Sequence, residues 1–241
     1  MRSNTFLRAA VALASATALL GACSDSDDEA NGSPSPTSSP ATTATTRAVV
    51  LPQGVAMLPS NDPGADFATL AAGRYRVPLG ESLAFDVDVP ANTYAHSNGL
   101  FLATGKAVLK TEVAGEDYGV PSDACNEDSI VPAGRTVDDL VRAIVQQPSY
   151  EVATEPIRLG GAEGSYLEVT VAAGAKRCAD GVAVPGTPSS VASFSGDYHG
   201  RWWILDLDGQ RLVVQQNCAC SAHQLDRVGS VPRSIAFTAI S

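Results

Sequence analysis

Apolar and polar residues alternate along several short segments of the chain after residue 70. From Leu83 to Val89 every second residue is a large apolar one, with Ala84, Asp86 and Asp88 between them. A period of two residues is typical of a β-strand with one buried face. Similar short apolar segments predict further strands at residues 74–79, 100–102, 107–113, 150–154, 165–171 and 234–239.

A hairpin is the clearest local pattern in the chain. Two mostly apolar segments, 202–207 and 210–214, flank the dipeptide Asp208-Gly209. Asp-Gly favours the positive φ angles that a two-residue hairpin turn requires. We therefore expect two antiparallel strands whose core face carries Leu205, Leu207, Leu212 and Val214.

Two segments favour helices. Thr136 and Asp139 have the spacing of a capping box, and apolar residues then recur at helical spacing until Pro148, namely Val137, Leu140, Val141, Ile144 and Val145. Ser221 and Gln224 form a second capping box before a short helix that carries Leu225 and Val228. The combined pattern predicts an α+β domain, with an antiparallel β-sheet flanked by two or more helices.

The start of the chain has the character of an export signal. Arg2 and Arg8 give the first residues a positive charge. An uncharged, apolar-rich stretch follows from Ala9 to Leu20, and small residues come after it. A helix of this length spans only about 18 Å, whereas the hydrocarbon core of a bilayer is about 30 Å thick. We expect this segment to be removed rather than to remain as a membrane span.

The segment Leu20-Gly21-Ala22-Cys23 resembles the lipobox of bacterial lipoproteins. The resemblance implies that the Cys23 sulfur carries a diacylglyceryl group, that the bond before Cys23 is cut, and that its new amino terminus is acylated. More than one acyl chain anchors a protein stably to a membrane. An ordinary secretory signal with a coincidental cysteine is the alternative.

Residues 23–47 read as a tether. An acidic patch is followed by a stretch of almost only Ser, Thr, Pro, Ala and Gly, which buries too little apolar surface to offset chain entropy. The predicted organisation is a signal peptide at 1–22, a lipidated disordered tether at 23–47 and one globular domain at 48–241. The domain would lie on the extracytoplasmic face of the cell membrane.

The charge balance excludes some partners. The chain carries 16 Lys and Arg against 26 Asp and Glu, for a net charge of −10. Removing the leader with Arg2 and Arg8 leaves 14 basic residues and a net charge of −12. Such a charge opposes binding to nucleic acid and electrostatic docking on anionic lipids.

Four cysteines remain once Cys23 is assigned to the lipid, namely Cys125, Cys178, Cys218 and Cys220. An even number in an exported chain indicates two disulfides, in any of three connectivities. A Cys218–Cys220 bridge would need a local turn, crossed pairing would avoid that strain, and Cys125–Cys178 would clamp the helix and strands between them. Zinc is the alternative, but this spacing is not a standard zinc pattern.

No catalytic motif is evident. His96, His199 and His223 form no metal-spaced pair, and Ser195-Gly196 lacks the preceding glycine of a nucleophile elbow. The chain has no phosphate-binding loop and no dinucleotide fingerprint. We expect no catalytic residue, no cofactor and no metal.

Two groups of carboxylates are candidate sites. Asp206 and Asp208 flank the hairpin turn, which already explains Asp208, while Asp206 either faces solvent or pairs with Arg211. Cys125 is surrounded by Asp123, Glu127 and Asp128. These carboxylates could hold a cation weakly, but a solvated loop is the favoured interpretation.

Trp202 and Trp203 point to opposite faces of one strand. An exposed tryptophan would stack on a sugar or anchor a partner. The favoured alternative is that both are covered.

Residues 203–214, followed by a short helix and Arg233–Phe237, resemble a domain common in lipoproteins and exported proteins of actinobacteria. Residues 83–90, Ala124-Cys125 and the helix at 136–144 match as well, so the resemblance covers most of residues 70–240. It implies structural motifs and no assigned activity. More loosely, the order of elements resembles the Mog1/PsbP-like fold, although Ala91–Tyr94 stands where a Gly-Trp element is often expected.

Three functions follow from these observations. The leading hypothesis is a non-catalytic, membrane-anchored domain that binds a protein or cell-envelope ligand, such as a glycan. The second is a structural or accessory envelope protein without a ligand site, and the third is an envelope hydrolase with an unrecognised site. Convergent polar groups in a pocket would favour binding or catalysis.

Overall fold

The structure, a computed structural model, describes residues 51–58, 68–79, 83–96, 99–101, 107–172, 178, 181–188, 192–194, 197–226 and 229–239. The segments predicted as signal peptide and tether, with Cys23, lie outside the described residues, as do Ser195 and Val228.

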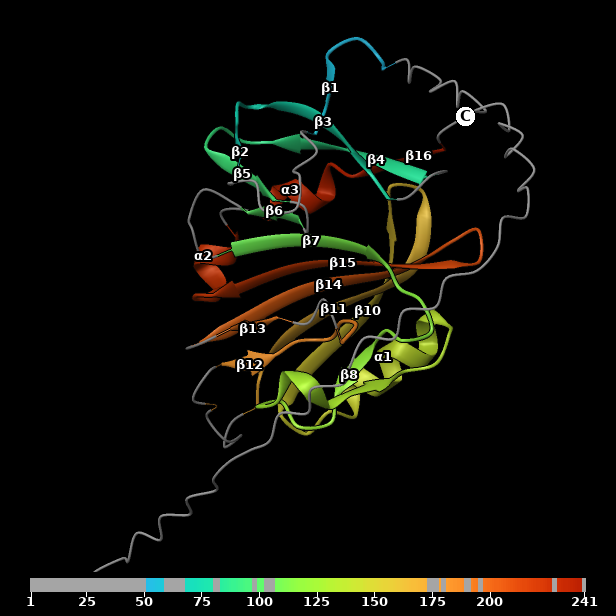
Figure 1. Cartoon of the computed structure of the whole chain (residues 1–241), viewed down its shortest axis with the longest axis vertical. Coiled ribbons are helices and arrows are strands. Elements are labelled where there is room, and N and C mark those ends of the chain that lie inside the picture. Colours follow the sequence, from blue (N-terminus) through green and yellow to red (C-terminus); the bar gives the residue numbers. More distant parts are fainter. Residues whose placement is uncertain are drawn as a thin grey trace, which may run out of the picture. The chain divides into compact units, whose positions relative to one another are not determined.

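Most of the described elements are strands (Figure 1). Sheet A has the order β1-β3-β4-β16, with β1 parallel to β3 and the other pairs antiparallel. Its strands are β1 (Val55–Met57), β3 (Gly73–Pro78), β4 (Leu83–Val89) and β16 (Ala236–Ala239).

Sheet B is antiparallel throughout and has the order β10-β11-β14-β15-β7-β6-β5-β2. Its long strands are β10 (Tyr150–Leu159), β11 (Ala162–Val171), β14 (Tyr198–Leu207), β15 (Gln210–Ala219) and β7 (Ala107–Val113). The shorter ones are β6 (Gly99–Phe101), β5 (Thr93–His96) and β2 (Ala68–Leu70). Two small pairs join β8 (Gly119–Pro121) to β9 (Ile130–Pro132) and β12 (Val182–Ala183) to β13 (Ser193–Phe194).

The predicted α+β class, a sheet flanked by two or more helices, is wrong, because the domain is β-rich with several sheets. Only α1 (Val137–Val145) is long enough to cover part of a sheet; α2 (Ala222–Asp226), α3 (Ser230–Arg233) and the 3₁₀ turn η1 (Glu127–Ser129) are single turns. The other face of sheet B is covered largely by a second sheet rather than by helices. Both helical patterns were present in the sequence, but they are too short to set the fold class.

Two hydrophobic cores lie against opposite faces of sheet B. Trp203 and Leu205 pack with Phe85 and other residues of β4, in what we call the sheet A core. Trp202 and Ile204 pack with Leu140 and Ile144 of α1, in what we call the helix core. Alternation along β14 therefore places its apolar side chains into two cores, which is why this strand reads as a continuous apolar run.

Local turn and cap predictions are confirmed. Asp208 and Gly209 have φ angles of 54° and 80°, and they join Leu207 to its partner Gln210. Thr136 and Asp139 form both bonds of the capping box at the start of α1. A second two-residue turn, Gly160-Gly161, has φ angles of 59° and 96° and joins β10 to β11. Strands β10 and β11 both continue up to this turn, so each is longer than the segments 150–154 and 165–171 predicted from the sequence.

One of the polar residues between the apolar positions of the segment 83–89 is buried. Asp86 is 6% exposed and accepts two bonds from Arg76, Nε–H to Oδ1 at 2.7 Å and Nη2–H to Oδ2 at 3.0 Å. These two residues are paired in register on β3 and β4. The bidentate geometry compensates the burial of both charges.

Strand β15 also carries buried polar side chains on the side of the helix core. Arg211, 4% exposed, donates from Nη1 to the carbonyl oxygens of Gly134 at 2.8 Å and Thr136 at 3.1 Å, and from Nη2 to that of Gly115 at 3.0 Å. Its guanidinium carbon lies 5.9 Å from the centre of the Tyr118 ring. Arg211 thus holds two loops and the first turn of α1 against sheet B.

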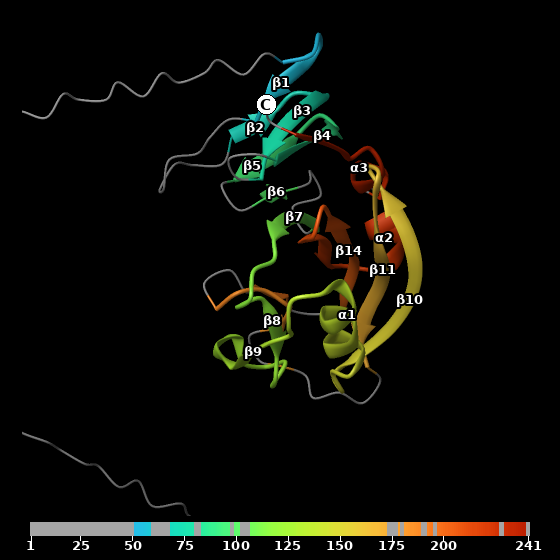
Figure 2. The same ribbon diagram turned by 90° about the vertical axis from the view of Figure 1, so that its right-hand side faces the viewer.

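Strand β10 forms one edge of sheet B and curves along one side of the domain (Figure 2). Because a two-residue turn closes on the pair Leu159 and Ala162, the alternate residues Val152, Thr154, Pro156 and Arg158 direct their backbone groups toward the free edge. Pro156 has no N–H to offer there. A proline at the outward row of an edge strand blocks pairing with a strand of another molecule.

We expect Pro156→Val to promote self-association, because valine restores a backbone donor at the centre of the free edge and favours β structure. Sedimentation velocity over a concentration series should show larger species than for the wild-type chain. Thr154→Val is the matched control, since it raises β-propensity on the same edge and adds no donor. Equal sedimentation of the two variants would show that Pro156 does not protect this edge.

Candidate polar pocket on strands β10 and β11

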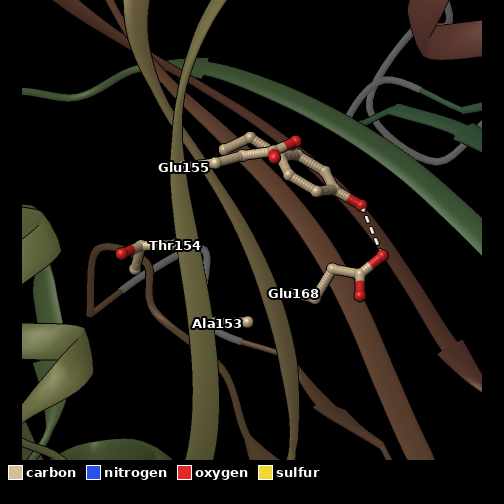
Figure 3. Close-up of a pocket in the computed structure, with 5 residues that line it drawn as sticks. Ala153, Thr154, Glu155 and Glu168 are labelled. Atoms are coloured by element: carbon tan, nitrogen blue, oxygen red, sulfur yellow. Dashed lines mark hydrogen bonds between the residues drawn. The ribbon is translucent and has the colours of Figure 1, made fainter.

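A shallow pocket of about 230 Å³ lies on sheet B near its β10 edge. It is lined by Ala153, Thr154 and Glu155 of β10 and by Tyr166 and Glu168 of β11 (Figure 3). Figure 3 shows Glu155 and Glu168 on the side of β10 away from Thr154. In this pocket, polar side chains of two neighbouring strands converge on a hollow surface.

Strand register positions these side chains. Glu155, Tyr166 and Trp203 are successive partners across β10, β11 and β14. Ala153, Glu168 and Arg201 are partners in the next row of the same face. Since residues two apart on a strand share a face, the two rows place their side chains side by side.

A chain of polar contacts runs along this face. The Tyr166 hydroxyl donates to Glu168 Oε1 at 2.8 Å, and Arg201 Nε lies 3.5 Å from the same oxygen. Arg201 Nη2 donates to Asp226 Oδ1 at the end of α2. The guanidinium therefore bridges a pocket carboxylate to a helix, which fixes the position of Glu168.

The surroundings of Tyr166, Arg201 and Asp226 shift the pKa values of all three groups. Burial raises the pKa of Tyr166, and the hydrogen bond to Glu168 and the nearby carboxylates raise it further, so the phenol stays protonated and remains a donor. Burial acts to lower the pKa of Arg201, but the bond to Asp226 and the neighbouring acidic groups raise it overall. The same bond lowers the pKa of Asp226. Arg201 is thus a permanent cation held between two carboxylates.

Glu155 differs from Glu168 in its surroundings. Its side chain is exposed, and among the residues that the structure describes no hydrogen bond or ion pair is formed by its carboxylate. It contributes to the raised pKa of Tyr166 through its charge. Glu155 therefore offers the pocket a carboxylate whose oxygens face water.

Trp202 and Trp203 are both covered by other side chains. Trp202 is fully buried and its indole N–H donates to Asn217 Oδ1 at 2.7 Å. Trp203 is 6% exposed, and its ring centre lies 5.2 Å from that of Tyr166. The interpretation of an exposed tryptophan as a binding platform is wrong, and the favoured alternative is confirmed.

The other candidate residues do not meet in one site. His199 Nδ1 lies 2.6 Å from the carbonyl oxygen of Cys220, His223 is exposed on α2, and His96 lies in β5. Within the described ranges, no group of three or more His, Cys, Asp and Glu residues has the arrangement of a metal site. The three histidines therefore lie on three different elements, β5, β14 and α2.

The carboxylates near Cys125 and near the hairpin hold local structure. Asp123 Oδ1 accepts the N–H of Cys125 at 2.9 Å, within the loop where Glu127 and Asp128 form η1. Asp206 Oδ1 accepts the N–H of Gly209 at 2.8 Å, and Asp208 is a turn residue. Asp206 does not pair with the Arg211 guanidinium, which instead binds three carbonyl oxygens.

The cysteines form two disulfides, Cys125–Cys178 and Cys218–Cys220. The Cα atoms of the second pair are 5.2 Å apart, less than the roughly 6.6 Å of alternate residues in an extended strand. The chain bends here because β15 ends at Ala219 and α2 begins at Ala222. The local turn needed for this bridge is therefore present.

The sequence pattern did not single out the pocket residues. Tyr166 and Glu168 were already two apart in the predicted strand 165–171, which placed them on one face. Glu155 fell just beyond the predicted strand 150–154, because Pro156 and the charged residues around it conceal the continuation of β10. Arg201 and Asp226 belong to the site only through strand register and the position of α2.

No protein-family model and no curated protein matches this chain. Among the described residues, no helix is both long and apolar enough to cross a membrane.

Proposed function

We propose that this chain is a membrane-anchored extracytoplasmic lipoprotein whose folded domain binds a protein or cell-envelope ligand without catalysing a reaction. The lipobox-like segment ending at Cys23 and the low-complexity tether support the location. The observation that carries the binding role is the pocket on β10 and β11, where Glu155, Tyr166 and Glu168 converge.

The chemistry of the pocket favours binding over hydrolysis. Its lining contains no serine, cysteine or histidine that would act as a nucleophile with a base. Glu168 accepts a hydrogen bond from Tyr166 and lies beside Arg201, so both of these neighbours hold its carboxylate in place as an acceptor. Fixed acceptors with a defined geometry are what a recognition site requires.

Crosslinking in intact cells tests the binding role. A photoreactive amino acid in place of the exposed Ala153, which shares the pocket face with Glu155, should yield one reproducible adduct from the lipidated full chain. The same amino acid at the exposed Glu127 of η1 is the control and should yield none. Loss of the adduct in a chain that also carries Glu155→Gln would support the pocket as its site. An absence of adducts at position 153, or the same adduct from both positions, would contradict ligand binding at this face.

The anchor is tested separately. We expect Cys23→Ala to abolish incorporation of a labelled fatty acid and to release the chain from the membrane fraction, because no other group would hold it there. Globomycin should cause a precursor of the wild-type chain to accumulate. Membrane retention of the Cys23→Ala chain without label would show that the leader acts as a span instead.

A further inference from the structure

We infer that the pocket on β10 and β11 receives a cationic side chain, the ammonium of a lysine or the guanidinium of an arginine, from a protein partner. This inference rests on the proposed function, since it names the chemical group that the same pocket recognises. It is carried by the hydrogen-bonding inventory, the charge and the size of the pocket.

The side chains on the face of Glu155, Tyr166 and Glu168 present acceptors, and their one donor is already used. The Tyr166 hydroxyl has one proton and donates it to Glu168 Oε1. The acceptors that remain toward the hollow are the Glu155 carboxylate, the second oxygen of Glu168 and the lone pairs of the phenol. A ligand group with several N–H donors fits this inventory, whereas a group made of acceptors does not.

The charge of the surroundings selects a cation. Arg201 is the basic residue of the polar chain, and its guanidinium is bound by Glu168 and Asp226. Only 18% of its side chain is exposed, so it does not extend into solvent to meet an anion. Glu155 adds a further negative charge with no ion pair among the described residues. The carboxylates thus outnumber the one cation and leave a net negative pocket.

The size and the aromatic packing of the pocket favour a side chain over a sugar ring. Its volume of about 230 Å³ is below the roughly 300–1,000 Å³ of sites that enclose a whole small molecule. A sugar would need an open aromatic face, but the Tyr166 ring is half-buried and packs against Trp203 with the ring centres 5.2 Å apart. A single flexible side chain reaches the carboxylates without displacing this packing.

Titration of the ¹⁵N-labelled full mature chain by NMR tests the inference. The probes are four: acetyl-Gly-Lys-Gly-amide, its arginine counterpart, the same tripeptide with Nε-acetyl-lysine, and glucosamine. We expect the lysine and arginine peptides to shift the amide signals of residues 153–155 and 166–168 in a saturable manner. The acetylated peptide, which has lost its charge, should leave them unchanged.

Two variants with equal changes in charge sharpen the test. Glu155→Gln should weaken binding of the lysine peptide about fivefold, the loss expected for one partly exposed ion pair. Glu163→Gln, also exposed on β11 but outside the pocket lining, should leave binding unchanged. Unchanged amide spectra away from the substituted site would show that both variants remain folded.

Several outcomes would overturn the inference. They are equal shifts from the lysine and Nε-acetyl-lysine peptides, equal weakening by the two variants, and tighter binding of glucosamine, which would assign the pocket to an aminated glycan. If the crosslink at position 153 forms but the cationic peptides do not bind, the proposed function stands and the cation is wrong. If neither occurs, both fail.

Discussion

Arg211→Met is expected to lower the free energy of unfolding by about 3–5 kcal/mol, because three buried hydrogen bonds from a charged donor are lost and their carbonyl acceptors stay buried. The arginine is buried and supplies donors to the carbonyl oxygens of Gly115, Gly134 and Thr136. Methionine fills a similar volume but donates nothing, so those three acceptors lose a partner. The Gly134 loop and the first turn of α1 would then lose these bonds to β15, whereas the backbone bond from Ala114 N–H to the Arg211 carbonyl oxygen at 2.7 Å would remain.

Urea unfolding of the chain from residue 23, with Cys23→Ala to prevent lipidation, measures this loss. Arg135→Met in the adjacent loop is the matched control, because its side chain is 75% exposed and pairs only with the exposed Glu116. Such a surface ion pair contributes at most about 1 kcal/mol. A similar small loss for both variants would mean that water replaces the Arg211 guanidinium and that the three carbonyl bonds contribute little.

Arg211 also shows where prediction from sequence ends. The hairpin itself could be predicted, because Asp208-Gly209 and its apolar flanks contain the whole signal. Cross-strand position then paired Arg211 with Asp206, and the register confirms the two as neighbours. Yet the Asp206 carboxylate binds the turn, and Arg211 binds loops that are distant in sequence. Its partners are set by tertiary packing and not by the hairpin.

The class of the fold was missed for a related reason. The capping box at Thr136 is local and was predicted correctly, whereas the pairing of β16 with β4 joins Phe237 to Phe85 across most of the domain. A second sheet covering sheet B therefore leaves no local pattern. The resemblance to a helix-flanked sheet led to the prediction that helices cover this face. Only α1 packs against sheet B in the way that was expected.

The pocket was partly predictable. The spacing of Tyr166 and Glu168 places both on one face of a strand whatever the fold. Glu155 and Arg201 join them because Gly160-Gly161 is a tight turn that aligns β10 with β11, and because β14 pairs on the other side. The length of β10 was underestimated because Pro156 weakens its strand pattern. The same residue is favoured at an edge, which is where β10 lies.

The two disulfides should differ in how much they stabilise the domain. Cys125–Cys178 closes a loop with a sequence separation of 53 that contains α1, β10 and β11, whereas Cys218–Cys220 spans a separation of 2. The chain-entropy model assigns about 4 kcal/mol to the long loop and about 1.5 kcal/mol to the short one. We therefore expect the Cys125→Ala/Cys178→Ala chain to lose more stability than the Cys218→Ala/Cys220→Ala chain through this effect.

The denaturant slope separates loop closure from packing. Cys218 and Cys220 are buried in the sheet A core, so their replacement also removes packing contacts. That loss acts on the folded state and leaves the slope unchanged, whereas opening the long loop expands the unfolded chain and should raise the slope. Urea unfolding of both double variants under non-reducing conditions measures stability and slope together. A raised slope for the Cys218→Ala/Cys220→Ala chain, or an unchanged one for the other, would contradict the unfolded-state origin of the difference.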